Sequence, residues 1–280
     1  MSQSASSNRP TRFLIISDTH NFQFTDNAGS ANPFRLPIPK VDVLLHCGDL
    51  THYGGIDDSY QKALQMLGGI DAELKLVIAG NHDVDLDKTY RKPRLSEEDN
   101  REAHKAAIRT MTGPRTAQAG VTYLEEGTYT FTLKNSVTFT VYASPYSPEF
   151  DNWAFATGVL DECPSGSAGC ENLLHAMKRV RPLMHCFGHI HEGHGAFVMD
   201  WAEKEREEIQ AGSAQWSQME RDDFDSDGEM ENEYPEPTQF GRIIRGQQTL
   251  MVNAAIMTGG MAMEPKNAPW IVDLDLARRA

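Results

Sequence analysis

Four short segments of the sequence carry side chains that bind metal ions, and each follows a run of apolar residues. They read Ser17-Asp18-Thr19-His20, His46-Cys47-Gly48-Asp49, Gly80-Asn81-His82-Asp83 and Gly188-His189-Ile190-His191. Carboxylate, amide and imidazole groups together suit divalent zinc, iron or manganese. Such a set could support metal-assisted hydrolysis, in which two cations activate a bridging hydroxide and neutralise the charge that grows on a phosphate group.

Two of the segments repeat one spacing. Asp18 and His20 stand two positions apart, as do His189 and His191. In an extended segment, side chains two apart point to the same side, so both members of a pair can reach one cation.

The other two segments supply different ligands. Asp49 follows Gly48, which permits a tight turn, and its carboxylate has two oxygens that could bridge two cations. Asn81 offers a neutral amide oxygen where another carboxylate would overcharge the site. Each motif has an ordinary alternative, since Asp-x-His is commonly a turn, Gly-Asp a loop and Asn-His-Asp a helix cap. Their occurrence together, each after a predicted strand, favours a single site, because ligands in α/β sheets gather beyond the carboxyl ends of strands.

The elements that must position these segments alternate along the chain. Apolar runs at 13–16, 41–45 and 74–78 predict strands buried on both faces, as in a sheet covered on both sides. Helical spacing occurs at 57–67, 96–111 and 171–180, and Ser96 with Asp99 is typical of a capping box. Alternation at 136–143, after 129–133, predicts a hairpin in a second, more antiparallel sheet. Apolar stretches at 184–187, 250–252 and 271–274 complete the domain.

Composition indicates one folded domain. With 280 residues, of which 40% are hydrophobic, the chain can bury a full core over residues 12–280, and residues 1–11 are expected to form a disordered tail. We find no apolar run long enough to span a bilayer and no apolar signal segment, which predicts a cytoplasmic protein. The cysteines are expected to be reduced, with a bond between Cys163 and Cys170 as the lesser alternative.

The net charge of -14 is unevenly spread. Residues 201–240 hold 13 acidic and three basic side chains, and their poor apolar periodicity predicts an acidic surface insertion. The remaining chain is only mildly acidic and has no basic stripe, which argues against long nucleic acid as a partner. Small phosphorylated molecules remain open as substrates, no membrane partner is expected, and the oligomeric state is undetermined.

The segments SDTH, HCGDLT, AGNHD and FGHIHEG, in this order, resemble the calcineurin-like metallophosphoesterase superfamily. Within it, VLLHCGDLTHYGG, VIAGNHDVDLD, ASPYSPEF and MHCFGHIHEGHG are similar to the metallophosphoesterase-domain-containing (MPPED-type) branch. The resemblance covers about residues 12–275. It implies an α/β fold, a four-layer α/β/β/α sandwich, with the site at the strand ends.

The resemblance also implies roles by position. The residues of the first metal would be Asp18, His20 and His191; Asp49 would bridge; Asn81 and His189 would hold the second metal. His82, paired with Asp83, would contact the phosphate and protonate the leaving oxygen as a general acid.

One expected motif is missing. The family pattern has a strand ending in a His-Gly-Pro-Pro-like loop after the ASPYSPEF-like segment, but no histidine occurs between His104 and His175. The second metal would then lack an imidazole, and the sandwich would lack one strand. None of His46, His52, His175, His185 and His194 has a position that argues for replacing it.

Two interpretations of this break stay open: a shortened or mis-spliced gene product, and a natural variant of low activity. The sequence thus predicts a metal-dependent phosphoesterase for small phosphodiesters, cyclic nucleotides among them, with a weak second metal site. The alternative is a catalytically weak protein that binds a nucleotide or a partner through a one-metal remnant.

Overall fold

The computed structural model describes residues 8–24, 38–148, 153–157, 170–202, 242–259 and 263–278. Its strands are β1 (Asn8–Ile16), β2 (Val41–His46), β3 (Ala72–Val77), β4 (Val121–Tyr123), β5 (Gly127–Thr132), β6 (Thr138–Ala143), β7 (Ser147–Pro148), β8 (Ala156–Thr157), β9 (Met184–Phe187), β10 (Gly195–Asp200), β11 (Gln248–Asn253) and β12 (Trp270–Ala277). The helices are α1 (Ser59–Gly68), α2 (Glu97–Thr112), α3 (Pro114–Ala119) and α4 (Glu171–Val180), with short 3-10 turns η1 (Ile56–Asp58), η2 (Val84–Leu86) and η3 (His191–Gly193).

The first sheet has the strand order β12-β1-β2-β3-β4. Its strands β1 to β4 are parallel, and β12 runs antiparallel to β1. Within β1, Leu14 and Ile16 face the core beneath helices α1 to α3, whereas Phe13 and Ile15 face the second layer of strands. The expectation of strands buried on both faces is confirmed.

The second layer packs on that sheet and consists of two pieces. One is the antiparallel hairpin β5–β6, as the alternation predicted, and the other has the order β10-β11-β9. Leu133 and Val137 of the hairpin turn and Leu250 and Val252 of β11 share one core with Phe13. Within the described residues no ladder joins β6 to β9, so both are edge strands; a strand missing from the family pattern stays a prediction.

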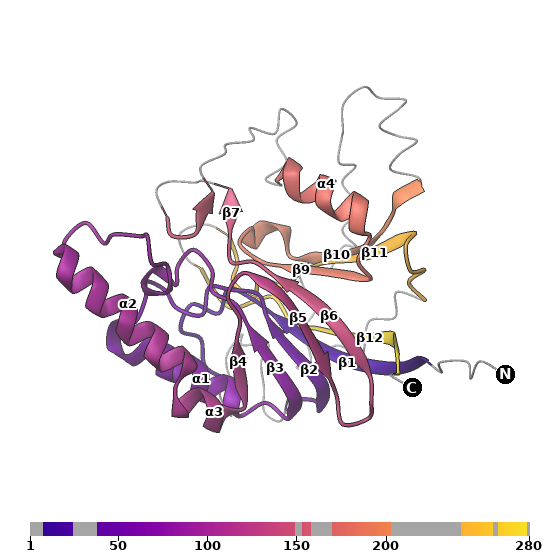
Figure 1. The fold of residues 1–280 in the computed structure, drawn as a ribbon, viewed down its shortest axis with the longest axis horizontal. Coiled ribbons are helices and arrows are strands. Elements are labelled where there is room, and N and C mark those ends of the chain that lie inside the picture. The colour runs from indigo at the N-terminus through magenta and orange to yellow at the C-terminus, as the bar shows by residue number, and fades with distance from the viewer. Residues whose placement is uncertain are drawn as a thin grey trace, which may run out of the picture.

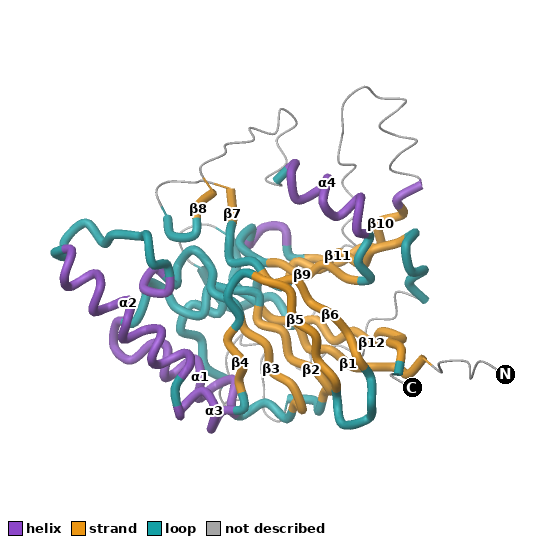
Figure 2. Tube along the Cα trace, viewed as in Figure 1, coloured by secondary structure: helices purple, strands orange, loops and turns teal. Residues whose placement is uncertain are grey.

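Helix α4 covers the outer face of the second piece, where Met177 packs against Met199, Trp201 and Met251. Figure 1 shows α4 over β9–β11 on one side and α1 to α3 on the other side of the first sheet. The α/β/β/α order of layers is therefore confirmed. Loops that follow the parallel strands gather at one end of the first sheet, beside the short β7–β8 pair (Figure 2).

Local signals placed several boundaries well. Ser96 caps α2, since its Oγ accepts the Asp99 N–H at 3.1 Å and donates to the Asp99 carboxylate at 2.6 Å. Helix α4 and strand β9 have the predicted bounds. The prediction of a disordered tail over residues 1–11 is wrong for residues 8–11. These residues belong to β1, which pairs with β12 from Asn8 onward.

The predicted insertion also starts too early. Trp201 is fully buried, and its Nε1 donates to Thr249 Oγ1 at 2.9 Å, so this residue belongs to the body. Residues 203–241, which hold the rest of the acidic stretch, lie outside the described residues, as does Cys163. The described cysteines, Cys47, Cys170 and Cys186, are free thiols.

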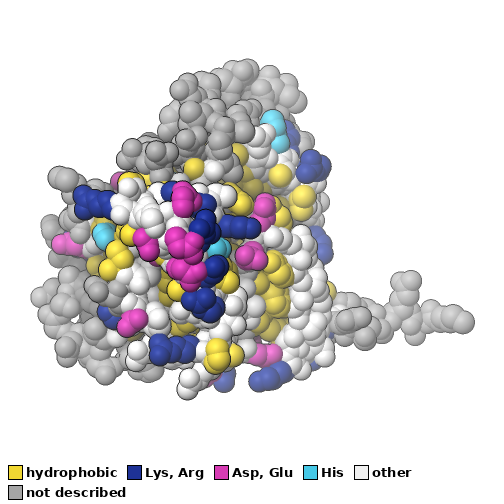
Figure 3. All heavy atoms as spheres, turned by 60° about the vertical axis from the view of Figure 1, so that its left-hand side comes forward, with side chains coloured by type: hydrophobic (Ala, Val, Ile, Leu, Met, Phe, Trp, Pro, Cys, Tyr) yellow, Lys and Arg dark blue, Asp and Glu magenta, His cyan; other side chains and the backbone are white. Residues whose placement is uncertain are grey.

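The face formed by α1 to α3 carries both signs of charge. Figure 3 shows Lys and Arg side chains interleaved with Asp and Glu on this side of the molecule. Several of them pair locally, as Lys105 does with Glu102 at 2.7 Å and Arg91 with Glu97 at 2.9 Å. A mixed face of this kind offers no continuous positive track for a phosphate backbone.

Candidate metal centre

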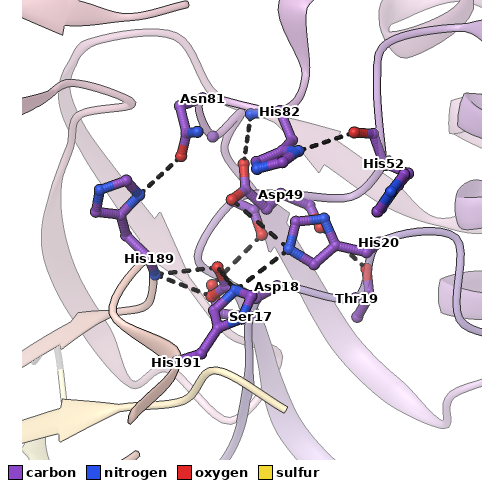
Figure 4. A network of polar contacts seen from close by, with 12 residues as sticks. Ser17, Asp18, Thr19, His20, Asp49, His52, Asn81, His82, His189 and His191 are labelled. Atoms are coloured by element: carbon purple, nitrogen blue, oxygen red, sulfur yellow. Dashed lines mark hydrogen bonds and ion pairs between the residues drawn. The ribbon is translucent and has the colours of Figure 1, made fainter. Parts of the chain in front are cut away.

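The carboxyl ends of β1, β2, β3 and β9 meet at one point and bring together all six residues predicted as ligands (Figure 4). Those from the first sheet are buried: Asp18 is 0%, His20 8%, Asp49 3% and Asn81 6% exposed. From the second layer, the loop after β9 carries the two histidines across to them. The ligand set assembled from distant motifs is therefore a spatial cluster.

Backbone strain is concentrated in the same loops. Asp18, His20, Asp49 and His189 all have positive φ, between 42° and 71°. For residues other than glycine this left-handed conformation costs free energy, of order 1–3 kcal/mol each when sparsely populated, and it clusters at functional sites. The surrounding hydrogen bonds hold these side chains inward despite that cost.

Three lone pairs converge at the first predicted cation position. His20 Nδ1 donates to the Thr51 carbonyl at 3.2 Å, and His191 Nδ1 donates to the Thr258 carbonyl at 3.2 Å. In the neutral rings, both Nε2 atoms are then bare. They lie 3.3 Å apart, and His191 Nε2 lies 3.2 Å from Asp18 Oδ1.

Two bare imidazole nitrogens and a carboxylate oxygen repel one another unless a cation or a proton lies between them. The ligand atoms of Asp18, His20 and His191 lie within 4.8 Å of one another, which one divalent ion could span. Backbone carbonyls that fix the outer ring nitrogen are typical supports of metal-binding histidines. The residues therefore fit a metal ion at this position.

Asp49 lies between the first predicted cation position and the backbone of His82. Its Oδ2 lies 3.9 Å from His20 Nε2, whereas its Oδ1 accepts the His82 N–H at 2.8 Å. Burial raises the pKa of Asp49 well above its usual value, and the charges of Asp18 and Asp83 raise it further. A bound cation would remove this penalty, which suits the bridging role that the family resemblance implies.

The neighbouring groups show the same electrostatic imbalance. Burial alone would raise the pKa of Asp18, but where a proton rather than a cation lies between His191 Nε2 and Asp18, that hydrogen bond and the nearby imidazoles lower it below the usual value. Burial, helped by the neighbouring His82, lowers the pKa of His20 to about 3. His20 is therefore neutral at ordinary pH, as a metal ligand must be.

The second predicted set is present but sparser. His189 Nδ1 donates to Asn81 Oδ1 at 2.8 Å, so these two proposed ligand atoms face each other. The His189 backbone N–H donates to both oxygens of Asp18 at 3.0 Å, which ties the β9 loop to the β1 loop. Beyond Asp49, Asn81 and His189, none of the candidate replacement histidines within the described residues joins this set.

Those other histidines have structural partners. Buried His46 accepts the Gly48 N–H and contacts Thr19 Oγ1 at 3.0 Å, and His52 is solvent-exposed. His185 stacks on Phe187, and His194 Nε2 donates to the Ala268 carbonyl while the ring stacks on Trp270. The packing interpretation favoured from the sequence is confirmed for His46, His185 and His194.

Asp83 does not pair with the His82 ring, which corrects the role expected for it. Its fully buried carboxylate accepts the N–H groups of Leu50, Thr51 and Gly80 at 2.9–3.1 Å and the Thr51 hydroxyl at 2.9 Å. The side chain therefore fastens the Asp49 loop to the Asn81 loop. Burial raises the pKa of Asp83 to about 6, although these donors act in the opposite direction.

The His82 ring is held by a backbone carbonyl instead. His82 Nδ1 donates to the His52 carbonyl at 2.8 Å, so Nε2 is the ring nitrogen that could transfer a proton or bind a cation. His82 also belongs, with His20 and Asp49, to a second group whose ligand atoms lie within 4.8 Å of one another. The arrangement therefore allows two roles for His82, a general acid or an additional ligand.

Sequence reasoning missed two glycines that make the site compact. A Cβ at Gly80 would collide with the Asp49 carboxylate and backbone, and one at Gly188 would collide with Asp18 Oδ2 and Ser17. Both positions precede ligand residues in the motifs, and that adjacency was the available signal. Gly48, for which a tight turn was expected, has φ +106°.

Comparison with known proteins agrees with this geometry. Residues 11–193 match the model of the calcineurin-like phosphoesterase family. Because this match spans more than half of the 280 residues, the chain belongs to the calcineurin-like phosphoesterase family. Membership supports metal-dependent phosphoester hydrolysis in general and confirms the resemblance recognised in the four motifs.

Individual relatives are similar over most of this chain. Human metallophosphoesterase domain-containing protein 1 is 28% identical over 220 residues, covering 67% of this chain and 63% of that protein. A UPF0046 protein of Caenorhabditis elegans is 30% identical over 217 residues, covering 66% of this chain and 52% of its own length. A protein named probable rhamnogalacturonate lyase C, from Emericella nidulans, is 29% identical over 231 residues, covering 73% of this chain and 20% of that protein. The chain thus spans less than two thirds of each of these relatives.

Among the residues that the structure describes, no helix is both long and apolar enough to cross a membrane.

Proposed function

We propose that this chain is a phosphodiesterase that hydrolyses small phosphodiesters, cyclic nucleotides among them, with two divalent metal ions of which the second is weakly held. The observation that carries the proposal is the convergence of Asp18, His20 and His191 on one point, with both rings oriented by backbone carbonyls. Manganese, iron and zinc all suit this ligand set. When bound, the cations supply Lewis-acid charge that activates water and neutralises the phosphate.

The chain's own residues perform the remaining tasks. Asp49 would supply the carboxylate shared by the two cations, and Asp83 holds its loop against the loop of Asn81. His82, oriented by the His52 carbonyl, protonates the leaving oxygen. No serine or cysteine nucleophile is required by this scheme.

The same proposal covers partners and location. A small phosphorylated substrate suits a site at the end of a sheet, and the mixed charge of the α1–α3 face gives no reason to invoke long nucleic acid. We further propose a cytoplasmic location and no membrane partner.

A second candidate is a weak enzyme that binds a nucleotide or partner through one metal. The direct bond between His189 and Asn81 favours it, because two second-site ligand atoms satisfy each other.

Turnover of bis(p-nitrophenyl) phosphate separates the two candidates. We expect hydrolysis that requires added Mn²⁺ and is abolished by Asp49→Ala. The surface variant Asp71→Asn should behave as wild type, since exposed Asp71 forms an ion pair with exposed Lys40. Metal binding without turnover at any Mn²⁺ concentration would favour the one-metal binding protein.

A further inference from the structure

An indole ring covers the proposed acid. Trp153 stacks on His82, with ring centroids 4.1 Å apart and an interplanar angle of 29°. Trp153 lies more than 70 positions further along the chain, between β7 and β8. Tyr53 packs edge-on against the same indole at 6.0 Å and 73°.

The indole is anchored by the segment that follows it. Ala154 and Phe155 are 1% and 7% exposed, within the core beneath α1 to α3. The Phe155 N–H donates to Asp87 Oδ2 at 2.7 Å, and Asp87 Oδ1 accepts the Thr89 N–H and hydroxyl at 2.7 Å. Asp87 directly follows η2, in the same loop as His82, so one carboxylate clamps the indole to the loop that carries the acid.

The remaining contacts of His82 show what the stack adds. The His52 carbonyl fixes Nδ1, the His20 ring lies nearly perpendicular with its centroid 4.6 Å from that of His82, and the His52 ring lies tilted with its centroid 6.0 Å away. One hydrogen bond leaves an imidazole free to tilt about it. A flat ring against its face removes that tilt, so that Nε2 keeps its direction among Asn81, Asp49 and His20 (Figure 4).

We propose that Trp153 is a positioning residue, which fixes the plane of the His82 imidazole for proton transfer, and that Asp87 fixes Trp153. The proposal rests on the proposed function, in which His82 is the general acid. Misplacing a reacting group by about 1 Å can cost roughly 10²-fold in rate, so a tilting acid should be a poor one. The rings that Trp153 contacts are those of His82 and Tyr53, neither of which is among the six proposed metal ligands, so metal content should not depend on it.

Kinetics provide one test. Trp153→Ala should lower kcat about tenfold or more for a diester with a poor leaving group such as phenol, less for p-nitrophenol, and leave KM and metal content near wild type. Trp153→Phe, which keeps a flat ring, should retain most of the wild-type kcat. Asp87→Asn should lower kcat in the same way as Trp153→Ala, but by a smaller factor. In a His82→Ala background, Trp153→Ala should have no further effect. An equal loss in both backgrounds, or a raised KM with unchanged kcat, would overturn the positioning role.

Nuclear magnetic resonance of the histidine rings provides a test that needs no turnover. The His82 ring protons should be shifted upfield by the indole in the wild type and should lose that shift in Trp153→Ala. His194, stacked on Trp270 at 5.4 Å, is the internal control and should not change. An unshifted His82 in the wild type overturns the proposal, whereas a shifted ring in a protein without turnover leaves the positioning contact intact and contradicts only the proposed function.

Discussion

The Nε2 atoms of His20 and His191 lie 3.3 Å apart although 171 positions separate the residues. In each ring, the Nδ1–H donates a hydrogen bond to a backbone carbonyl. Neither ring can turn its lone pair away without breaking that bond. The site is thus organised for a cation by backbone atoms of Thr51 and Thr258 as much as by its ligands.

Replacing Asp49 tests whether one carboxylate serves both cations. Asp49→Ala should lose both metal retention and phosphoesterase turnover, because each oxygen faces a different part of the site. Metal analysis and a diester assay on the same preparation measure this, with Asp71→Asn as the matched surface control. Wild-type turnover by Asp49→Ala would remove the two-metal scheme.

Replacing His82 distinguishes a general acid from a ligand. His82→Ala should keep near-normal metal content and lose roughly 10²- to 10⁴-fold in turnover, most strongly for poor leaving groups. Since His82 also lies within ligand distance of His20 and Asp49, metal content is the deciding measurement. A fall in bound metal, with equal loss for good and poor leaving groups, would assign His82 to the metal instead.

Much of the site could be predicted because each motif is local. A buried strand followed by Ser-Asp, Gly-Asp or Gly-His fixes where its carboxyl end points, so the positions of Asp18, Asp49 and His189 beyond strand ends could be predicted from the sequence. Their meeting follows from parallel strands ending at one edge. The core of β1, with Leu14 and Phe13 on opposite faces, was likewise readable from its apolar run.

The features that the sequence did not predict depend on tertiary contacts. The family resemblance implied that Asp83 pairs with His82, whereas its carboxylate accepts backbone N–H groups of two loops. Trp153 stands outside the four metal-binding motifs, and the burial of Ala154 and Phe155 together with the Asp87–Phe155 bond brings it over His82. Supporting carbonyls such as that of Thr258 carry no side-chain signature at all.

Acid sensitivity should depend on a buried histidine outside the ligand set. Burial lowers the pKa of His46 from 6.5 to about 4, so the folded protein keeps this ring neutral where the unfolded chain protonates it. Between pH 6.5 and 4 the unfolded state therefore binds more protons, and the free energy of unfolding should fall as pH falls. One unit of pKa shift is worth about 1.4 kcal/mol, so the contribution is of order 1–3 kcal/mol.

His46→Asn is the comparison, because its amide oxygen can still accept the Gly48 N–H but does not titrate in this range. Urea unfolding of metal-free protein at several pH values should show a shallower decline for this variant than for wild type. If the free energy of unfolding falls with the same slope in both proteins, His46 is not held neutral in the folded state. A constant difference between the two curves would then reflect only lost packing.

Removing the acidic stretch tests its independence from the body. Deletion of residues 205–236 should change activity and melting temperature little, because a polar segment without apolar periodicity contributes few core contacts. The deletion retains Trp201, whose side chain is fully buried. A large drop in melting temperature would show that the stretch packs against the body.

The ratio of tightly bound metal to protein tests the central claim most directly. In the proposed scheme the first site would have its full set of Asp18, His20, Asp49 and His191, whereas among the described residues the second would have Asp49, Asn81 and His189. Disturbing even a supporting partner typically weakens a metal site about 10- to 100-fold, so a missing imidazole should cost at least as much. After reconstitution at micromolar metal and dialysis, elemental analysis should give close to one cation per chain, with turnover rising only in large excess of Mn²⁺. Two tightly held cations per chain would contradict the weak second site, and none would contradict the metal centre itself.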